Sequence, residues 1–444
     1  MIERASANDM MQLATDVGPV PMQVGAVLVL APEPGLDPDV ARTVLSERLT
    51  RVPRLRQRLV WAGVGSGRPV WVDDATFDVE AHVHVRACPA PGDEAALLAV
   101  ATAILGTRLP LDRPPWDATI VTGLADGSTA LVVVFNHVLA DGIGGLAVLA
   151  SLVDGLPLPI DHGFPRPAPS RFALTVDAAR SRVASTGRWR HALSTVRDAL
   201  AELRSDGDTT AARCSLNTPT GSRRATTVVR VDLEAVHAAA RAHDATVNDV
   251  VLTAVTGALG DLLDQRGEHI EQLVVSVPIS ARPSAGAREL GNAVGVMPVQ
   301  LPLGGDAVSR LTEIGRITRA RKDSTDARGS SAVLLGPLFR AMAWCRVLRW
   351  FMDHQHLINT LVTNVRGPDV PLTFAGTAIR TVTPISIVTG NVTVAFAVLS
   401  YAGMLTITVN SDADACPDVD RLTERLAQTL ATLTTVDGRS TANA

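Results

Sequence analysis

The residues best suited to chemistry form a short polar group that follows an apolar run. Residues 131–135 are an unbroken apolar, largely β-branched run of the length that a buried strand needs. Asn136 and His137 follow directly, and Asp141 and Gly142 come soon after. His137 can take and return a proton near neutral pH, as a general base must. An H-x-x-x-D-G pattern also occurs by chance in turns, so other parts of the chain have to support this reading.

The elements around this group are predicted from the pattern of apolar residues. The run 131–135 predicts a strand, and the Leu- and Ala-rich residues 145–152 predict a helix. A second apolar run, 118–122, is expected to pair with the first through a turn at Asp126-Gly127. The end of a strand that opens into a helix is a common place for reactive side chains in α/β proteins.

Composition excludes several classes of protein. Hydrophobic residues make up 46% of the 444 residues and charged residues 19%, which is typical of a globular protein. A net charge of −4 gives no reason to expect a nucleic-acid partner. The four cysteines lie far apart without a C-x-x-C motif, which favours a reducing cytoplasm and argues against a metal site. The sequence shows neither a signal peptide nor an apolar run that could span a bilayer, so a cytoplasmic protein is expected, with peripheral contact to a membrane or lipid droplet left open.

Strands and helices alternate in both halves of the chain, which predicts a mixed α/β fold. Prolines crowd residues 155–171, and residues 205–224 are polar, as linkers are. We therefore expect an N-terminal domain at 1–165, a helical and loop linker at 166–224 and a C-terminal domain at 225–444. A cleft is expected between the two domains.

A second candidate site lies at the start of a helix in the second half. Thr246 and Asp249 have the spacing of a capping box, and Asn248 lies between them. The amide of Asn248, like that of Asn136, could donate a hydrogen bond to an oxyanion, which is worth about 3 kcal/mol in acyl transfer. For Asn248, a structural position at the helix N-terminus is an equally good interpretation.

Several stretches, in this order, resemble the bacterial wax ester synthase/diacylglycerol acyltransferase family over nearly the whole chain. In two places the sequence differs from the family pattern: Pro115 stands where Leu is usual, and Asn136 replaces the first His of an H-H-x-x-x-D-G motif. The similar stretches are Pro21–Gly25, Val52–Arg58, Asp112–Trp116, Asn136–Gly142, Thr246–Leu252, Val277–Arg282, Leu290–Asn292, Val362–Pro368 and Phe374–Gly376.

The resemblance implies a fold like that of chloramphenicol acetyltransferase, with two similar domains and a tunnel between them. It implies that His137 is the catalytic base, that Asp141 pairs with Arg282 to hold the motif loop, and that Asn292 and Asn364 belong to further motifs. For Asn136 we favour a structural role, because alternation along the strand turns its side chain away from that of His137.

The activity implied by the resemblance is transfer of an acyl group from acyl-CoA, a co-substrate, to a hydrophobic alcohol, without a metal or a bound cofactor. A covalent acyl-enzyme is not expected, because the His acts on the acceptor and the sequence has no G-x-S-x-G elbow. Two alternatives remain: tailoring of a secondary metabolite, with an acyl-carrier protein as the donor, and a non-catalytic relative that binds lipid.

Overall fold

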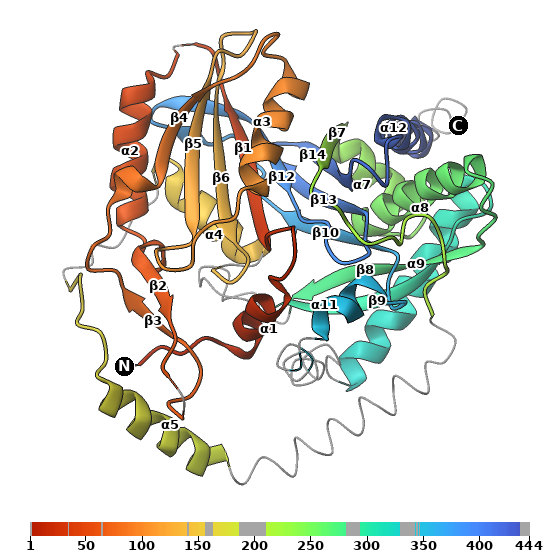
Figure 1. Cartoon of the computed structure of the whole chain (residues 1–444). Helices are drawn as coiled ribbons and strands as arrows, with labels where there is room; N and C mark the ends of the chain where they lie inside the picture. Colours follow the sequence, from red (N-terminus) through yellow and green to blue (C-terminus); the bar gives the residue numbers. More distant parts are fainter. Residues whose placement is uncertain are drawn as a thin grey trace.

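The computed structural model describes residues 2–33, 35–63, 65–139, 142–155, 163–185, 210–280, 294–328, 342, 345 and 347–435. Two six-stranded sheets dominate this part of the chain, and a small two-stranded sheet lies beside the first of them (Figure 1). The small sheet pairs β2 (Gln57–Val60) with β3 (Val70–Asp73).

The first sheet has the strand order β11-β12-β1-β6-β5-β4. The strand β6, which precedes His137, lies inside the sheet and is antiparallel to both β1 and β5. The predicted pairing of the two apolar runs is therefore confirmed. The two outermost strands on one side, β11 and β12, come from the second half of the chain. The bounds are β1 Gln23–Leu30, β4 Val83–Ala87, β5 Trp116–Thr122, β6 Thr129–Asn136, β11 Thr373–Phe374 and β12 Thr377–Ile385.

The second sheet has the order β7-β14-β13-β10-β8-β9. Its strand β10 runs parallel to β13 along residues 361–366, but it pairs with β8 only at Thr360 and Leu361. Within the described residues, the C-terminal end of β10 therefore has a strand on one side only. The bounds are β7 Arg224–Asp232, β8 Gln272–Ser280, β9 Val294–Pro302, β10 Thr360–Arg366, β13 Val394–Tyr401 and β14 Met404–Asp412.

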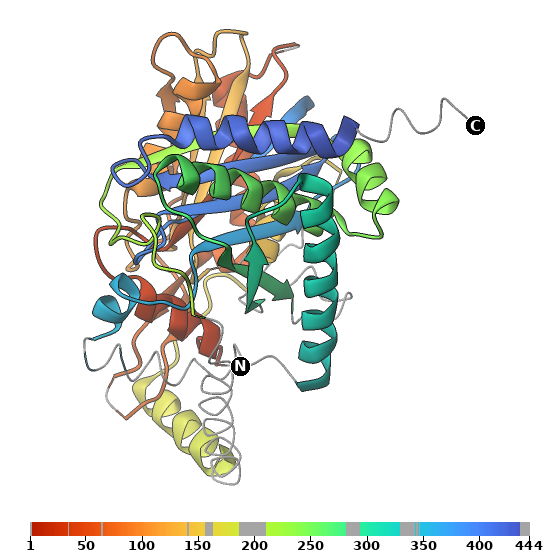
Figure 2. The ribbon, with the colours of Figure 1, turned by 90° about the vertical axis from the view of Figure 1, so that its right-hand side faces the viewer.

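Helices cover the sheets on faces set by the alternation of side chains along the strands. Leu28 packs with residues of α2 and α4 on one face of the first sheet, and its neighbour Val27 packs with α3 on the other. The helices α7, α8, α9 and α12 share the core of the second sheet (Figure 2). The bounds are α1 Ala7–Thr15, α2 Pro38–Thr50, α3 Glu94–Gly106, α4 Gly142–Leu152, α5 Arg171–Ser185, α7 Leu233–Ala242, α8 Val247–Gln265, α9 Ala307–Arg328, α11 Leu348–Asp353 and α12 Val419–Thr435, with short 3-10 helices at Pro53–Arg56 and Val79–Ala81.

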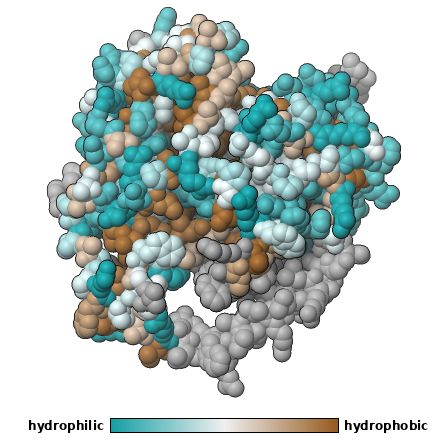
Figure 3. Space-filling model, viewed as in Figure 1, coloured by the Kyte–Doolittle hydropathy of each residue, from teal (hydrophilic) through white to brown (hydrophobic). Residues whose placement is uncertain are grey.

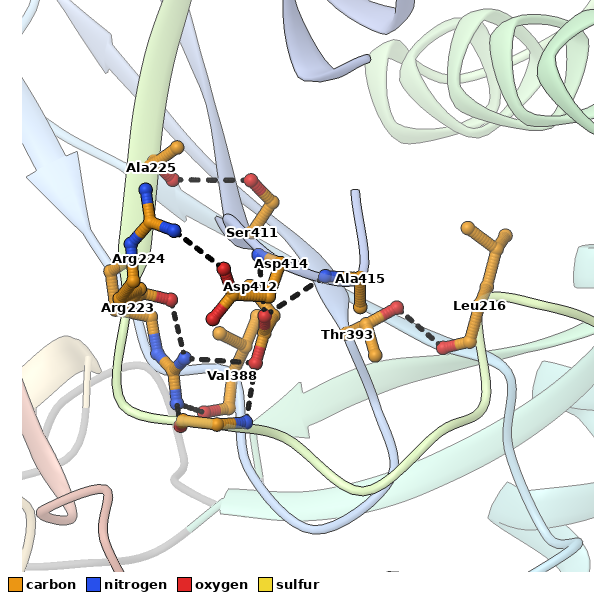
Figure 4. A network of polar contacts seen from close by, with 11 residues as sticks. Leu216, Arg223, Arg224, Ala225, Val388, Thr393, Ser411, Asp412, Asp414 and Ala415 are labelled. Carbon is orange, nitrogen blue, oxygen red and sulfur yellow. Dashed lines mark hydrogen bonds and ion pairs between the residues drawn. The ribbon is translucent and has the colours of Figure 1, made fainter. Parts of the chain in front are cut away.

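An ion pair between the partly buried Arg224 and the buried Asp412 fixes the start of the second sheet (Figure 4). Arg224, at the first position of β7, donates to Oδ2 of Asp412 at 3.2 Å and to the carbonyl oxygen of Val388 at 3.3 Å. Asp412 is 1% exposed and also accepts the backbone N–H of Gly221 at 2.6 Å. Burial lowers the pKa of the Arg224 guanidinium, and the charge of Asp412 opposes this effect. The pair thereby joins the entry to β7, the end of β14 and the segment after β12.

No single helix in the described part of the chain is long and apolar enough to cross a membrane. By length and composition alone, the bent pair α7 and α8, with an angle of 94° between them, passes the same test together. On the face shown in Figure 3, hydrophobic residues gather toward the middle of the molecule, and hydrophilic residues cover most of the right-hand side.

Candidate active site

His137 lies directly after β6, where the chain makes a tight turn. Its backbone N–H donates to the carbonyl oxygen of Met22 at 2.8 Å, and the N–H of Asn136 donates to the carbonyl oxygen of Pro115 at 2.9 Å. The N–H of Leu139 then donates back to the carbonyl oxygen of Asn136 at 2.9 Å, which closes the turn. The His137 side chain is half-buried. Backbone bonds to two neighbouring segments therefore fix the position of His137.

Asn136 is 1% exposed, and both groups of its side-chain amide are engaged. Its Oδ1 accepts the N–H of Val138 at 2.9 Å, an Asx turn, and its Nδ2 donates to Oδ2 of Asp16 at 3.0 Å. Asp16 also accepts the N–H of Met22 at 3.1 Å and pairs with Arg108. These bonds fit the structural role that we expect for Asn136. Asp16 was missed by sequence reasoning, because an isolated Asp 120 residues away carries no signal of this contact.

The helix α4 begins at Gly142, three residues before the predicted start at Gly145. Gly145 lies against the end of the Phe135 ring: a Cβ atom at this position would come within 2.4 Å of Cζ. Only a glycine lets the helix approach β6 this closely. The inner face of α4 is also fixed, because Val148 and Leu152 are each 1% exposed in the core.

An acidic residue just beyond α4 ties its far end to the second half of the chain. Asp154 pairs with Arg48 and accepts the N–H groups of Ala375 at 3.1 Å and Gly376 at 2.9 Å, in the turn between β11 and β12. Partial burial opposes ionisation of Asp154, but hydrogen bonds from Thr373, Arg48 and Gly376 outweigh it and lower its pKa to about 2.

Two of the predicted residues from the second half lie together. Asn248 is in the first turn of α8, where Thr246 and Asp249 form the predicted capping box. Oδ1 of Asn248 accepts a hydrogen bond from Nδ2 of Asn364 on β10 at 3.4 Å. The cap is complete without the Asn248 side chain, which leaves that side chain available for another role.

A cavity of about 440 Å³ lies between α4, β10 and β12. Asn364 is in its lining, so the cavity borders the pair of asparagines. Sequence reasoning did not find this cavity, because its wall has the same aliphatic composition as a protein core. Its lining residues are Leu28, Leu149, Ala150, Val153, Asn364, Val365, Arg366, Pro368, Leu372, Ile379, Val382, Leu399 and Tyr401.

Three predicted site residues, Asp141, Arg282 and Asn292, lie outside the described residues. The expected pair of Asp141 and Arg282 therefore stays a prediction. In the described part of the chain, no group of three or more His, Cys, Asp or Glu side chains could hold a metal ion.

The two sheets and their helices form the two-domain fold of chloramphenicol acetyltransferase-like enzymes, as expected. One solved structure with this arrangement is the wax ester synthase/diacylglycerol acyltransferase of Marinobacter aquaeolei VT8, with a TM-score of 0.71 at 23% identity, covering 97% of this chain and 98% of the other. Another is the starter condensation domain of rhizomide synthetase in complex with C8-CoA and Leu-SNAC, with a TM-score of 0.62 at 17% identity over 98% and 94% of the two chains.

Sequence comparison then identifies the family. The wax ester synthase/diacylglycerol acyltransferase catalytic domain matches residues 5–251, and the C-terminal domain of the same family matches residues 290–434. A protein of Mycobacterium tuberculosis described as a probable diacylglycerol O-acyltransferase is 29% identical, over 95% of this chain and 93% of its own length. The chain belongs to the wax ester synthase/diacylglycerol acyltransferase family, and the protein is an acyltransferase.

Proposed function

We propose that the protein transfers an acyl group from acyl-CoA to the hydroxyl group of a hydrophobic alcohol, with His137 as the general base. The observation that carries this proposal is the family membership together with His137, held by backbone bonds at the end of β6. The apolar cavity beside α4 supports a lipid substrate, because such walls exclude water and favour aliphatic groups.

In the proposed mechanism, Nε2 of His137 removes the proton of the acceptor hydroxyl as its oxygen attacks the thioester carbonyl carbon. The resulting tetrahedral oxyanion collapses, the carbon–sulfur bond breaks, and the imidazolium returns the proton to the departing CoA thiolate. Asn248 is the proposed amide donor to the oxyanion, with its side chain oriented by Asn364. Asp141 and Arg282 would hold the loop between His137 and α4, and Asn136 would fix its first turn through Asp16 and Val138.

The proposal also covers the acyl donor and the place in the cell where the protein acts. We propose acyl-CoA as the donor and take an acyl-carrier protein as its competitor. Contact with a membrane or lipid droplet would bring the protein to its alcohol. Both points can be measured directly, by comparing turnover of acyl-CoA with that of the matching acyl-carrier protein and by co-sedimentation of the protein with lipid vesicles.

His137→Ala tests the mechanism. We expect it to lower release of free thiol from acyl-CoA to the background rate in the presence of a long-chain alcohol, with little change in melting temperature. His269→Ala is the matched control, because the His269 side chain is 85% exposed and lies outside the proposed site. A His137→Ala variant that keeps more than a few per cent of wild-type turnover would remove His137 from the role of base.

A further inference from the structure

The cavity beside α4 has a largely apolar wall with a few polar residues. Apart from Asn364, Arg366 and Tyr401, the described residues that line it are aliphatic. The hydroxyl group of Tyr401 is already engaged, because it donates to the carbonyl oxygen of Ile379 at 3.0 Å and accepts the N–H of Leu372 at 2.8 Å. Tyr401 thus presents its ring to the cavity, and the remaining polar residues, Asn364 and Arg366, both belong to the end of β10.

The volume of the cavity and the chemistry of its wall determine which kind of ligand it can bind. A volume of about 440 Å³ lies within the range of small-molecule sites. A polar ligand would lose hydrogen bonds to water there without regaining them from an aliphatic wall. An aliphatic chain has no such groups to satisfy, and its burial is favourable along its whole length.

The wall of the cavity that α4 forms cannot move away from the cavity. The helix α4 contributes Leu149 and Ala150 to the lining, and Val153 follows directly after its end. The adjoining side of α4 is fixed by the contact of Gly145 with Phe135 and by side chains buried in the core. Tightly packed interiors absorb added volume poorly, so extra atoms on the cavity side of α4 must enter the cavity. Ala150 has the smallest side chain in the lining.

We infer that this cavity holds the aliphatic chain of a lipid substrate and that Ala150 determines how long that chain can be. The inference rests on the proposed function and deepens it, because it identifies a residue for chain-length selection. The chain could be that of the acyl donor or that of the alcohol, since the two have the same chemistry beyond their reacting ends.

The test is Ala150→Phe, with kcat/KM measured across two substrate series. One series runs from butyryl-CoA to stearoyl-CoA with a single alcohol, and the other runs from short to long straight-chain alcohols with a single acyl-CoA. We expect the loss in kcat/KM to grow with chain length in one series, because each methylene excluded from an apolar pocket is worth about ten-fold or more. The series that shows this trend identifies the source of the chain.

Two further variants test whether the effect of Ala150→Phe depends on the volume of the cavity at the α4 wall. Leu149→Ala enlarges the same wall and should move the optimum toward longer chains in the same series. Ala179→Phe adds the same ring at an exposed position on α5 and should leave both profiles as they are in the wild type. An equal loss at every chain length in both series, or no change in either, would overturn the inference.

Binding of a fluorescent polyene fatty acid separates this inference from the proposed reaction. If the wild-type protein releases no thiol from any acyl-CoA, the proposed reaction fails, but the cavity can still be tested by this probe. Weaker binding to Ala150→Phe than to Ala179→Phe, by about ten-fold or more, would support the chain-binding cavity. Equal binding to both variants would contradict it.

Discussion

The contact between Gly145 and Phe135 gives the sharpest test of how the motif is positioned. In Gly145→Ala, the new Cβ would lie 2.4 Å from Cζ of Phe135, with two more ring atoms at 3.2 and 3.4 Å. Carbon atoms pack best at about 3.5–4.0 Å, so the ring or α4 has to move by roughly 1 Å. Phe135 is only 4% exposed and sits in a full core, so the ring has no free space to enter.

The magnitude follows from these distances. Overpacking of this kind costs about 1–3 kcal/mol in the free energy of unfolding. The same shift moves the start of α4, which directly follows the loop from His137, and a misplacement of about 1 Å can lower turnover on the order of a hundred-fold. We therefore expect Gly145→Ala to lose both stability and activity, measured by urea unfolding and by thiol release from acyl-CoA.

Two comparisons make this prediction refutable. Gly106→Ala, at the end of α3, adds a methyl group where no atom lies within 4 Å, and it should change neither quantity. In the double variant, Phe135→Leu should relieve the clash of Gly145→Ala. The loss in the free energy of unfolding should then be smaller, by about 1 kcal/mol or more, than the sum of the losses in the two single variants. Strictly additive losses, or a fully active and stable Gly145→Ala, would refute the reasoning.

Three further predictions concern polar groups that are wholly or partly buried. Asp412→Ala should lower the free energy of unfolding by about 3 kcal/mol, the lower end for a buried pair, because it leaves the partly buried Arg224 without its counter-ion. The pKa of Asp154 falls from 3.8 to about 2 on folding, so ionised Asp154 stabilises the fold by about 2 kcal/mol at most. This stabilisation is complete above pH 4 and is lost as the pH falls toward 2. In Asp154→Asn, the free energy of unfolding should therefore depend less on pH over that range than in the wild type. Asn136→Ala should lower the melting temperature, because Oδ2 of Asp16 loses the amide that donates to it and the N–H of Val138 loses its acceptor; Asn136→His, which restores the usual family motif, should change kcat little.

The sequence predicts those features that depend on local patterns. The apolar runs 118–122 and 131–135 predict paired strands, and β5 and β6 confirm the pairing. The Thr246 and Asp249 spacing predicts a capping box, which the start of α8 has. In each case neighbouring residues determine the outcome through the strand period or through hydrogen bonds within one helical turn.

Features that depend on contacts between distant segments were not predicted. The helix was expected only from about residue 145, because the glycines from Gly142 to Gly145 were interpreted as a tight turn or a close approach to a ligand; α4 instead begins at Gly142, and its Gly145 packs closely on Phe135. The partnership of Asp16 with Asn136 joins segments 120 residues apart and has no sequence signature. The predicted limits of the domains, 1–165, 166–224 and 225–444, stay a prediction; β11 and β12, from residues 373–385, pair within the first sheet.

The pairing of β11 and β12 within the first sheet has a consequence for the proposed site. β1 pairs with β6, which ends next to His137, on one side and with β12 from the second half on the other. Asp154 then joins the end of α4 to the turn that precedes β12. The helix that follows the motif and the opposite wall of the cavity are therefore held by the same sheet and the same carboxylate. A change that moves one of them moves the other, so the position of the base and the shape of the chain-binding cavity should be perturbed together by any variant that loosens Asp154.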